Sequence, residues 1–353
     1  MNKKRLVVYA IVLAVLAALV YLQFRQWRNF DWHQFFEDVR YVAWRDVVHA
    51  LILVFVVYVL RAVRWKLFLG PDRKDISTLN LLSPTVVGFT ALALLGRAGE
   101  VIRPYLIARR TSTSLSSQLA VWTVERIFDI AAFTVLMVSA IFLPTQLREF
   151  AMQRPEVYRW LHLTGYVLTA LVLVLFCGAL LINFRGPAIA NWIEARSAHS
   201  AGKLAHRIAQ RIREFAAGLR TIHGPASFLM ISAVSLLMWW IIAVSYKEVA
   251  HAYGAPMREM SSSSVLLLMG SSMVGSMVQL PGVGGGSQLA TIEALDKIFH
   301  VPRELAVSCG ILLWLVTFVA IVPFGLALAR YEGISLVKVS EESEKEEAET
   351  VIP

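Results

Sequence analysis

Long apolar stretches alternate with short charged ones along the whole chain. Several of them approach the roughly 20 apolar residues that an α-helix needs to cross a bilayer. The runs are continuous rather than alternating residue by residue, which excludes a transmembrane β-barrel. The pattern therefore predicts an all-α polytopic membrane protein with six full spans. We expect these spans at about 6–22, 47–60, 115–143, 161–184, 226–249 and 304–329.

Two further segments are apolar but broken by glycine and proline, residues 76–110 and 261–298. If the first crossed the membrane fully, the basic stretch 185–225 would lie outside, although Lys and Arg gather in cytoplasmic loops. Broken helices at membrane depth are tolerated where they line a protein-walled cavity. We therefore expect two opposed re-entrant helical hairpins, the first entering from the cytoplasm and the second from outside. Ordinary close packing of helices would explain the same glycines.

Composition and charge agree with this class. Hydrophobic residues make up 57% of the 353 residues, above the roughly 45–50% of a soluble domain. The net charge of +9 fits cytoplasmic loops that meet anionic lipid, so we expect no nucleic-acid partner. Arg61 and Arg64 directly follow the span at 47–60, and we interpret them as flanking cations in the cytoplasm. Cys177 and Cys309 lie in apolar runs, which predicts no disulfide.

The domain organisation is simple. We expect one transmembrane domain at 1–330 and an acidic, disordered tail at 331–353, with both termini in the cytoplasm of a cell with a bacterial-type inner membrane. Within the domain, apolar residues of the cytoplasmic segment 185–225 recur at helical spacing, which predicts an amphipathic helix. This helix lies either on the membrane surface or against the protein's own loops.

A first group of charged residues lies in the first interrupted segment. Glu100 is three residues from both Arg97 and Arg103, so the three side chains can share one helix face. Pro104 disfavours helix at Arg103 and can begin a new helix. Because arginine forks match phosphate geometry, a helix break beside two guanidinium groups predicts an anion site. The alternative is an internal Arg–Glu–Arg network that neutralises itself.

A second group lies inside the span at 115–143. Glu125 and Asp129 are i,i+4 neighbours, and Arg126 reaches Asp129 at i,i+3. Ionisable groups at membrane depth are costly, so we expect this group to line a polar interior. Its net negative charge either answers the arginines of the first group, as a structural salt bridge, or binds donors of a headgroup.

The second interrupted segment carries a loop with four glycines. It lacks the Lys-Ser/Thr ending of a P-loop and follows no strand, so nucleotide binding is not predicted. Its backbone N–H groups can face an anion, or the loop is a bare hairpin turn. The residues that we expect to line the cavity are Pro281, Gly282, Gly284, Gly285, Gly286 and Gln288.

These motifs together resemble a known family. The sequences GRAGEVIRPYL at 96–106 and VERIFD at 124–129, followed by the late Pro-Gly-rich loop, are similar to the transmembrane region of lysylphosphatidylglycerol synthases, the flippase-like domain family. Arg61, Arg64 and Trp65, which follow the second span, also match the sequence pattern of this family. The resemblance covers roughly residues 5–330.

The resemblance implies a membrane-embedded lipid-translocating domain without the soluble domain that attaches the amino acid. The family's late loop often continues to an acidic residue, and the neutral Gln288 weakens the case for a contact with a cationic headgroup. The expected function is to move an amphipathic lipid, of phospholipid or polyprenyl type, between leaflets. Arg97 and Arg103 would hold the headgroup, and Glu100 would orient them.

Two other functions stay open. One is a non-catalytic membrane subunit that docks a lipid-modifying enzyme through its basic segment and acidic tail. The other is a membrane-embedded transferase, for which Glu125 or Asp129 is the candidate acid or base. The sequence carries no HExxH or GxSxG motif and no clustered metal ligands. We therefore predict no cofactor and no metal, and membrane lipid is the expected partner.

Overall fold

The computed structural model describes residues 30–70, 76–142, 155–197, 224–276 and 285–336, with single residues and short pieces between 205 and 216 and between 339 and 342. This part of the chain consists of helices and their connections, without a strand. The helix bounds are α2 Trp32–Arg40, α3 Trp44–Leu69, α4 Thr78–Leu95, α5 Ile102–Thr111, α6 Leu115–Phe142, α8 Pro155–Ser197, α10 Gly224–His251, α11 Ser262–Gly275, α12 Gly286–Glu293, α13 Arg303–Trp314 and α14 Val322–Tyr331. The prediction of an all-α protein is confirmed.

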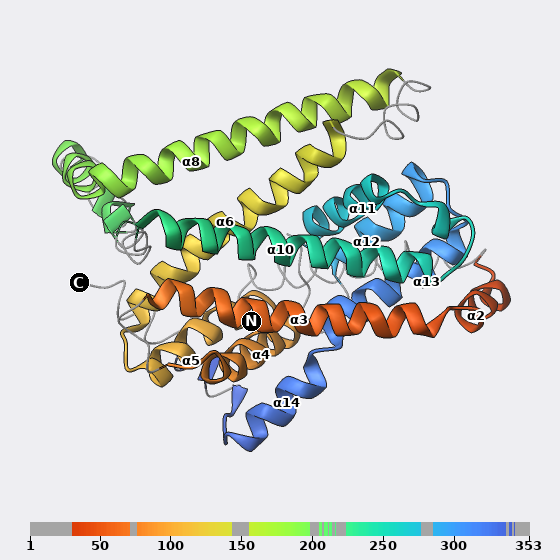
Figure 1. Ribbon diagram of the computed structural model, residues 1–353, viewed down its shortest axis with the longest axis horizontal. Coiled ribbons are helices and arrows are strands. Elements are labelled where there is room, and N and C mark those ends of the chain that lie inside the picture. Colours follow the sequence, from red (N-terminus) through yellow and green to blue (C-terminus); the bar gives the residue numbers. More distant parts are fainter. Residues whose placement is uncertain are drawn as a thin grey trace, which may run out of the picture.

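Helices α3 and α10 run side by side through the middle of the molecule (Figure 1). The backbone N–H of Ala43, just before α3, donates to the carbonyl of Ala252, just after α10, over 2.8 Å. The two helices are therefore antiparallel, and their last residues lie at opposite ends of the bundle. We name these the Leu69 end, where α3 finishes, and the His251 end, where α10 finishes.

The first interrupted segment is a helical hairpin. Helix α4 ends in a short 3-10 helix, Gly96–Val101, and α5 then runs back along α4. At the open side of the hairpin, Arg110 donates to the carbonyl of Asn80 over 3.1 Å. Further in, a Cβ placed on Gly88 would overlap the Cβ of Arg103, so glycine is what lets α4 and α5 touch. The chain thus returns to the Leu69 end, where α6 begins.

The second interrupted segment has the same form. Its helices α11 and α12 meet where a Cβ on Gly275 would overlap the backbone of Gly286. Lys247, near the end of α10, donates to Ser262 at the start of α11 over 3.1 Å. The hydroxyl of Tyr253 lies 2.8 Å from that of Ser308 on α13, which places the start of α13 at the His251 end too.

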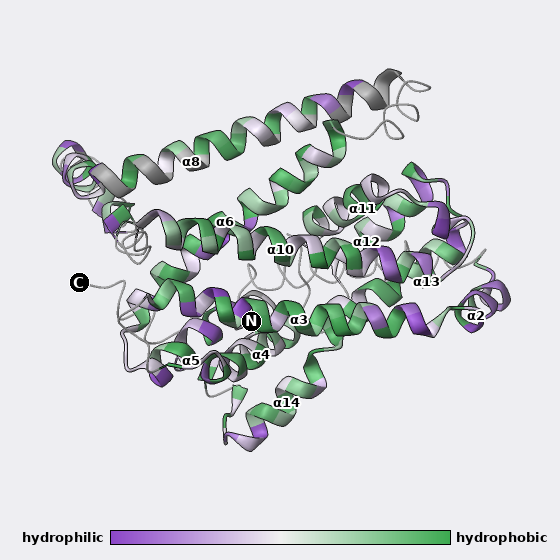
Figure 2. Ribbon diagram, in the orientation of Figure 1, coloured by the Kyte–Doolittle hydropathy of each residue, from purple (hydrophilic) through white to green (hydrophobic). Residues whose placement is uncertain are grey.

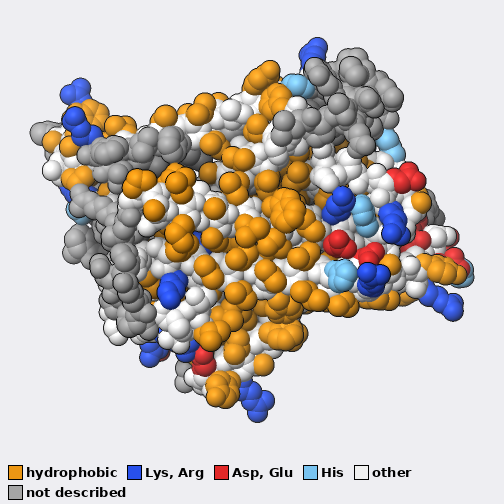
Figure 3. All heavy atoms as spheres, viewed as in Figure 1, with side chains coloured by type: hydrophobic (Ala, Val, Ile, Leu, Met, Phe, Trp, Pro, Cys, Tyr) orange, Lys and Arg blue, Asp and Glu red, His pale blue; other side chains and the backbone are white. Residues whose placement is uncertain are grey.

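The two hairpins therefore enter the bundle from opposite ends, as predicted. The first starts and finishes at the Leu69 end, and the second at the His251 end. Among the described residues, four segments are long and apolar enough to cross a membrane: α3, α4, α10 and the run Arg303–Tyr331. Figure 2 shows that the middle of these helices is hydrophobic. Figure 3 shows a hydrophobic face with charged side chains concentrated toward its ends. The first expected span, at 6–22, lies outside the described residues.

Helix α8 continues beyond the expected end of the fourth span at residue 184. It runs as one helix past Gly186 and Pro187 to Ser197. The described residues that follow fold back on it: a Cβ on Gly186 would meet the Cβ of Ala216 at 2.8 Å, and Arg213 pairs with Glu194 at 2.6 Å. The described residues of the basic segment therefore pack against the protein's own chain, which is one of the two arrangements expected for it.

The end of the chain returns to the Leu69 end. Helix α13 continues through a π-helical turn, Leu315–Val319, into α14. Glu332, just after α14, pairs with Arg110 at 3.0 Å. The expected disordered tail starts with a packed stretch, because Val339 is buried beside α5 and Glu342 accepts a hydrogen bond from Tyr105 over 2.8 Å. The rest of the tail lies outside the described residues.

Candidate functional site

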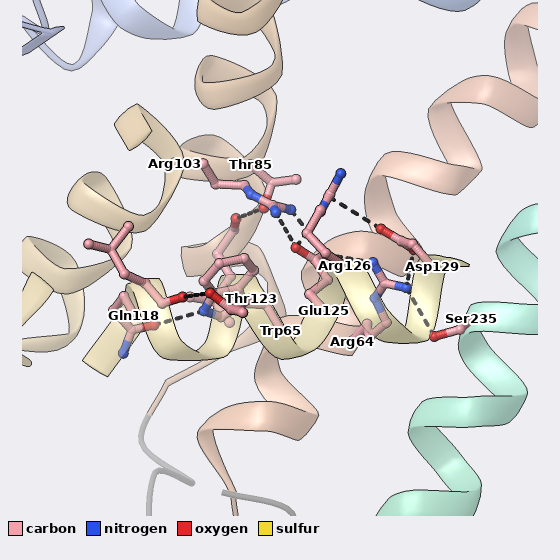
Figure 4. Close-up of polar contacts among 12 residues, drawn as sticks. Arg64, Trp65, Thr85, Arg103, Gln118, Thr123, Glu125, Arg126, Asp129 and Ser235 are labelled. Carbon is pink, nitrogen blue, oxygen red and sulfur yellow. Dashed lines mark hydrogen bonds and ion pairs between the residues drawn. The ribbon is translucent and has the colours of Figure 1, made fainter. Parts of the chain in front are cut away.

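Two carboxylates from α6 form the centre of the candidate site. Glu125 and Asp129 are one helical turn apart and both are buried. Carboxylates in an apolar interior need opposite charges and hydrogen-bond donors to offset the loss of water. Figure 4 shows that these partners come from several helices.

Arg64 of α3 holds both carboxylates. Its Nη2 donates to Glu125 Oε1 and its Nη1 to Asp129 Oδ1, each over 2.6 Å. The same Nη1 donates to Ser235 Oγ of α10 over 3.0 Å. Arg64 therefore ties α3, α6 and α10 together, and its side chain is completely shielded from solvent.

The interpretation of Arg64 as a flanking cytoplasmic cation is wrong. Helix α3 continues nine residues past the expected end of the span at residue 60, so Arg64 lies inside the bundle rather than at its rim. The signal in the sequence was the pair of large apolar residues that follow it. Trp65 and Phe68 are both fully buried, which is incompatible with a solvent-exposed end of a span.

Arg103 of α5 binds Glu125 from the other side. Its Nη1 donates to Oε1 over 3.2 Å and its Nη2 makes a short contact with Oε2. The guanidinium also lies over the ring of Trp65, with 4.4 Å between its central carbon and the ring centroid. Of the two alternatives for the α6 group, a salt bridge to an arginine of the first group is what the structure shows for Arg103.

The other two residues of the first group behave differently. Glu100 is half-buried and makes no hydrogen bond or ion pair with the described residues. The self-neutralising triad is therefore not formed through Glu100, because the guanidinium of Arg103 is bound to Glu125 instead. The side chain of Arg97 lies outside the described residues.

The remaining contacts in the network come from Arg126 and a tryptophan. Arg126 Nη2 lies 3.2 Å from Asp129 Oδ2, which confirms the predicted i,i+3 pair, and 3.6 Å from Glu125 Oε2. Its side chain is 41% exposed. Trp239 of α10 donates its indole N–H to Asp129 Oδ1 over 3.2 Å.

Arg61 is a second residue that sequence reasoning misplaced. It lies one turn before Arg64 on α3, and its Nη1 is buried without a hydrogen-bond partner among the described residues. Its guanidinium carbon lies 4.5 Å from the ring centroid of Phe89 on α4. The guanidinium carbon of Arg103 lies 5.1 Å from the same ring.

The glycine loop is described only at its end. Pro281, Gly282 and Gly284 lie outside the described residues, and Gly285 caps the start of α12. The side chain of Gln288, half-buried on α12, makes no hydrogen bond with the described part of the chain. The prediction that this loop lines the cavity therefore stays a prediction.

One group of possible metal ligands lies at the His251 end, away from the charge network. Asp46 and His49 of α3 and Glu248 of α10 each offer a ligand atom, and these atoms lie within 4.8 Å of one another. Asp46 and Glu248 are half-buried and His49 is exposed.

Comparison with known proteins now identifies the family. A family model described as "Lysylphosphatidylglycerol synthase TM region" matches residues 7–325. The chain belongs to this family. The resemblance drawn from its motifs is thereby confirmed.

The chain is also similar to curated proteins whose names describe them only as membrane proteins. Two are called "UPF0104 membrane protein" and come from Methanothermobacter thermautotrophicus. One is 26% identical over 291 residues, which cover 78% of this chain and 81% of the relative. The other is 22% identical over 307 residues, covering 82% and 86% respectively. No solved structure matches the chain.

In this member of the family, the two sequence motifs meet at one place. The motif at 96–106 supplies Arg103, and the motif at 124–129 supplies both carboxylates and Arg126. The first hairpin is therefore linked to α6 by charge, and α6 is linked to α3 and α10 through Arg64. This arrangement places polar side chains in the middle of the apolar bundle.

Proposed function

We propose that this protein moves an amphipathic lipid between the two leaflets of its membrane, and that the lipid headgroup passes the charge network of Arg103, Glu125 and Asp129. The observation that supports this most is a polar network at the centre of apolar helices, beside a hairpin that enters from one end. Polar groups buried in a membrane protein are costly and typically mark a substrate path. Paired interrupted segments in the two halves of a chain are typical of transporter sites.

The two bonds to Glu125 have different consequences for movement. Arg64 joins long helices that run the length of the bundle, whereas Arg103 sits on the short α5 of the first hairpin. Breaking the Arg103–Glu125 pair would release the hairpin while Arg64 keeps α3, α6 and α10 together. A headgroup that competes for Arg103 would therefore couple lipid binding to opening of the hairpin.

The transferase alternative has less support. A general acid or base must be free to exchange a proton with the reacting group. Each oxygen of Glu125 and Asp129 already accepts from an arginine of the same chain. A reacting group would therefore have to displace an arginine before it could exchange a proton with either carboxylate.

We place the protein in the inner membrane with the Leu69 end in the cytoplasm. The basic stretch 185–225 leads into the start of α10 at that end, where Arg109, Arg110 and Arg330 are exposed as well. Exposed cations are also present at the other end, among them Arg45 and Arg258. Several exposed acids lie at the other end, among them Glu37 and Glu259. Lys and Arg near the ends of spans favour the cytoplasmic side.

The test is lipid movement by the purified full-length protein in sealed vesicles. A fluorescent phospholipid is added, and the fraction that a membrane-impermeant quencher reaches is followed over time. We expect faster exchange with the wild type than with empty vesicles, and loss of this gain in Arg103→Gln. Arg258→Gln is the matched control, because Arg258 is exposed and lies outside the network. Wild-type exchange no faster than in empty vesicles would contradict the proposal.

A further inference from the structure

Each carboxylate of the network already contacts several donors. Both oxygens of Glu125 accept from Arg103, and one also accepts from Arg64. The two oxygens of Asp129 are shared between Arg64, Arg126 and the indole of Trp239. Three guanidinium groups, from Arg64, Arg103 and Arg126, thus already share the two negative charges of these carboxylates.

Arg61 is therefore an additional cation within this cluster. Its guanidinium makes no hydrogen bond or ion pair with the described residues and lies over the face of Phe89, which it shares with Arg103. Attraction to an aromatic face is weaker than the cost of removing an arginine from water. One end of the Arg61 guanidinium is thus buried and lacks the oxygen acceptor that such a group requires.

The net charge of the cluster indicates the charge of the ligand that would balance it. Four guanidinium groups, from Arg61, Arg64, Arg103 and Arg126, lie with two carboxylates, so the described cluster carries a net charge of +2. An anion would reduce this excess, whereas a positively charged headgroup would increase it. A phosphate group fits both requirements, because it is anionic and its oxygens accept paired bonds from a guanidinium fork.

We infer that the site selects lipids whose phosphate headgroup is net negative, and that Arg61 is the residue that binds this phosphate beside Phe89. This inference rests on the function proposed above. It covers anionic phospholipids and polyprenyl phosphates, which present the same group. It disfavours zwitterionic lipids, and it disfavours aminoacylated lipids most, because their amino groups would add positive charge.

The selectivity is tested by binding to the full-length protein in nanodiscs of phosphatidylcholine. Four probes are added separately: phosphatidylglycerol, undecaprenyl phosphate, lysylphosphatidylglycerol and inorganic phosphate. We expect binding of phosphatidylglycerol or undecaprenyl phosphate at least about tenfold tighter than of lysylphosphatidylglycerol, which corresponds to the loss of one charge-assisted contact. The stronger of the first two identifies the source of the phosphate. Inorganic phosphate that competes equally well would show a site for free anions and overturn the lipid assignment.

Three variants test the role of Arg61. Arg61→Gln should lose the preference for the anionic lipid, Arg61→Lys should retain part of it, and Arg258→Gln should bind as the wild type does. Arg61 makes no hydrogen bond or ion pair with the described residues, so Arg61→Gln should unfold in phosphatidylcholine at a temperature no lower than the wild type. Unchanged lipid preference in Arg61→Gln would overturn the inference.

Measuring movement of the same lipids separates this inference from the proposed function. Selective binding that depends on Arg61, without any movement, would contradict the proposed translocation and leave the phosphate site standing. Movement of all lipids at equal rates in wild type and Arg61→Gln would contradict the phosphate site and leave the translocation standing.

Discussion

Arg64 and Glu125 form an ion pair at 2.6 Å in which neither side chain is accessible to solvent. The two residues are 61 positions apart in the sequence and belong to different helices. The pair fixes α3 against α6. It is also the contact that the other charged residues depend on, because it holds the Glu125 carboxylate in place for Arg103.

The first prediction concerns this pair. Arg64→Met leaves Glu125 and Asp129 without their shared buried donor, although Arg103 and Arg126 remain. Removing one partner of a buried pair typically destabilises a protein by about 3–5 kcal/mol. We expect a large fall in the unfolding temperature of the detergent-purified protein. Methionine keeps the length and packing of the side chain, so the loss reports on charge rather than on a cavity.

A double substitution isolates the electrostatic part of this effect. Arg64→Met combined with Asp129→Asn removes the carboxylate that has lost its buried guanidinium and keeps the Arg103–Glu125 pair, so we expect it to be more stable than Arg64→Met alone. If the single variant unfolds as the wild type does, the network does not stabilise the bundle.

The second prediction concerns the close approach of α4 and α5. Gly88→Val places atoms where the Cβ of Arg103 already lies, so the hairpin must open. Such overpacking typically destabilises by about 1–3 kcal/mol. We also expect the variant to lose lipid movement, because Arg103 is displaced from Glu125. Thermal unfolding and vesicle exchange measure the two effects.

Gly178 on α8 provides the matched control. A Cβ added there meets no atom within 4 Å, so Gly178→Val should leave exchange unchanged. Equal losses in both variants would mean that the effect of Gly88→Val comes from helix propensity and not from the hairpin contact.

The sequence predicted the parts of the fold that depend on local patterns. Apolar runs located α3, α6 and α10, and glycine and proline interruptions located both hairpins, because backbone contact between helices requires small residues. The pairing of an arginine of the first group with the carboxylates of α6 was one of the two alternatives that the sequence left open, and the structure shows it for Arg103 and Glu125.

The partners contributed by α3 could not be predicted in the same way. A cation at the end of an apolar run is normally a flanking residue, and only the path of α3 between α6 and α10 shows that Arg64 is interior. The same holds for Glu100, which forms no ion pair with Arg103 because Arg103 is bound to Glu125 of a distant helix. Such features depend on tertiary contacts between distant segments, which residue spacing does not encode.

The third prediction concerns topology. Because the first hairpin returns to the Leu69 end, Leu79 and Arg109 should face the same side of the membrane and Tyr41 the opposite side. All three are exposed. Single cysteines at these positions, in a Cys177→Ser, Cys309→Ser background, should react accordingly with an impermeant maleimide in oriented vesicles. Labelling of Leu79→Cys and Arg109→Cys from opposite sides would show that α4 crosses the membrane without returning.

The fourth prediction concerns pH and the connection between α12 and α13. Burial acts to raise the pKa of the Asp296 carboxyl, but hydrogen bonds and charges from Lys297 and Arg303 outweigh it, so the pKa lies below its ordinary value. A lowered pKa in the folded state contributes stability above the unfolded pKa of about 3.9 and loses it as the pH falls. Arg303 Nη1 lies 2.8 Å from Asp296 Oδ2.

We therefore expect Asp296→Asn to lower the unfolding temperature at pH 7, by a stability difference below about 1 kcal/mol for such a partly exposed pair. The difference from the wild type should shrink as the pH falls through 4 toward 3, because the wild-type carboxyl then takes up its proton. Unfolding temperatures of both proteins between pH 7 and pH 3 measure this. Glu259→Gln is the control, since Glu259 is exposed and makes no ion pair with the described residues. A difference that stays constant with pH would mean that Asp296 stabilises the connection by packing and not by charge.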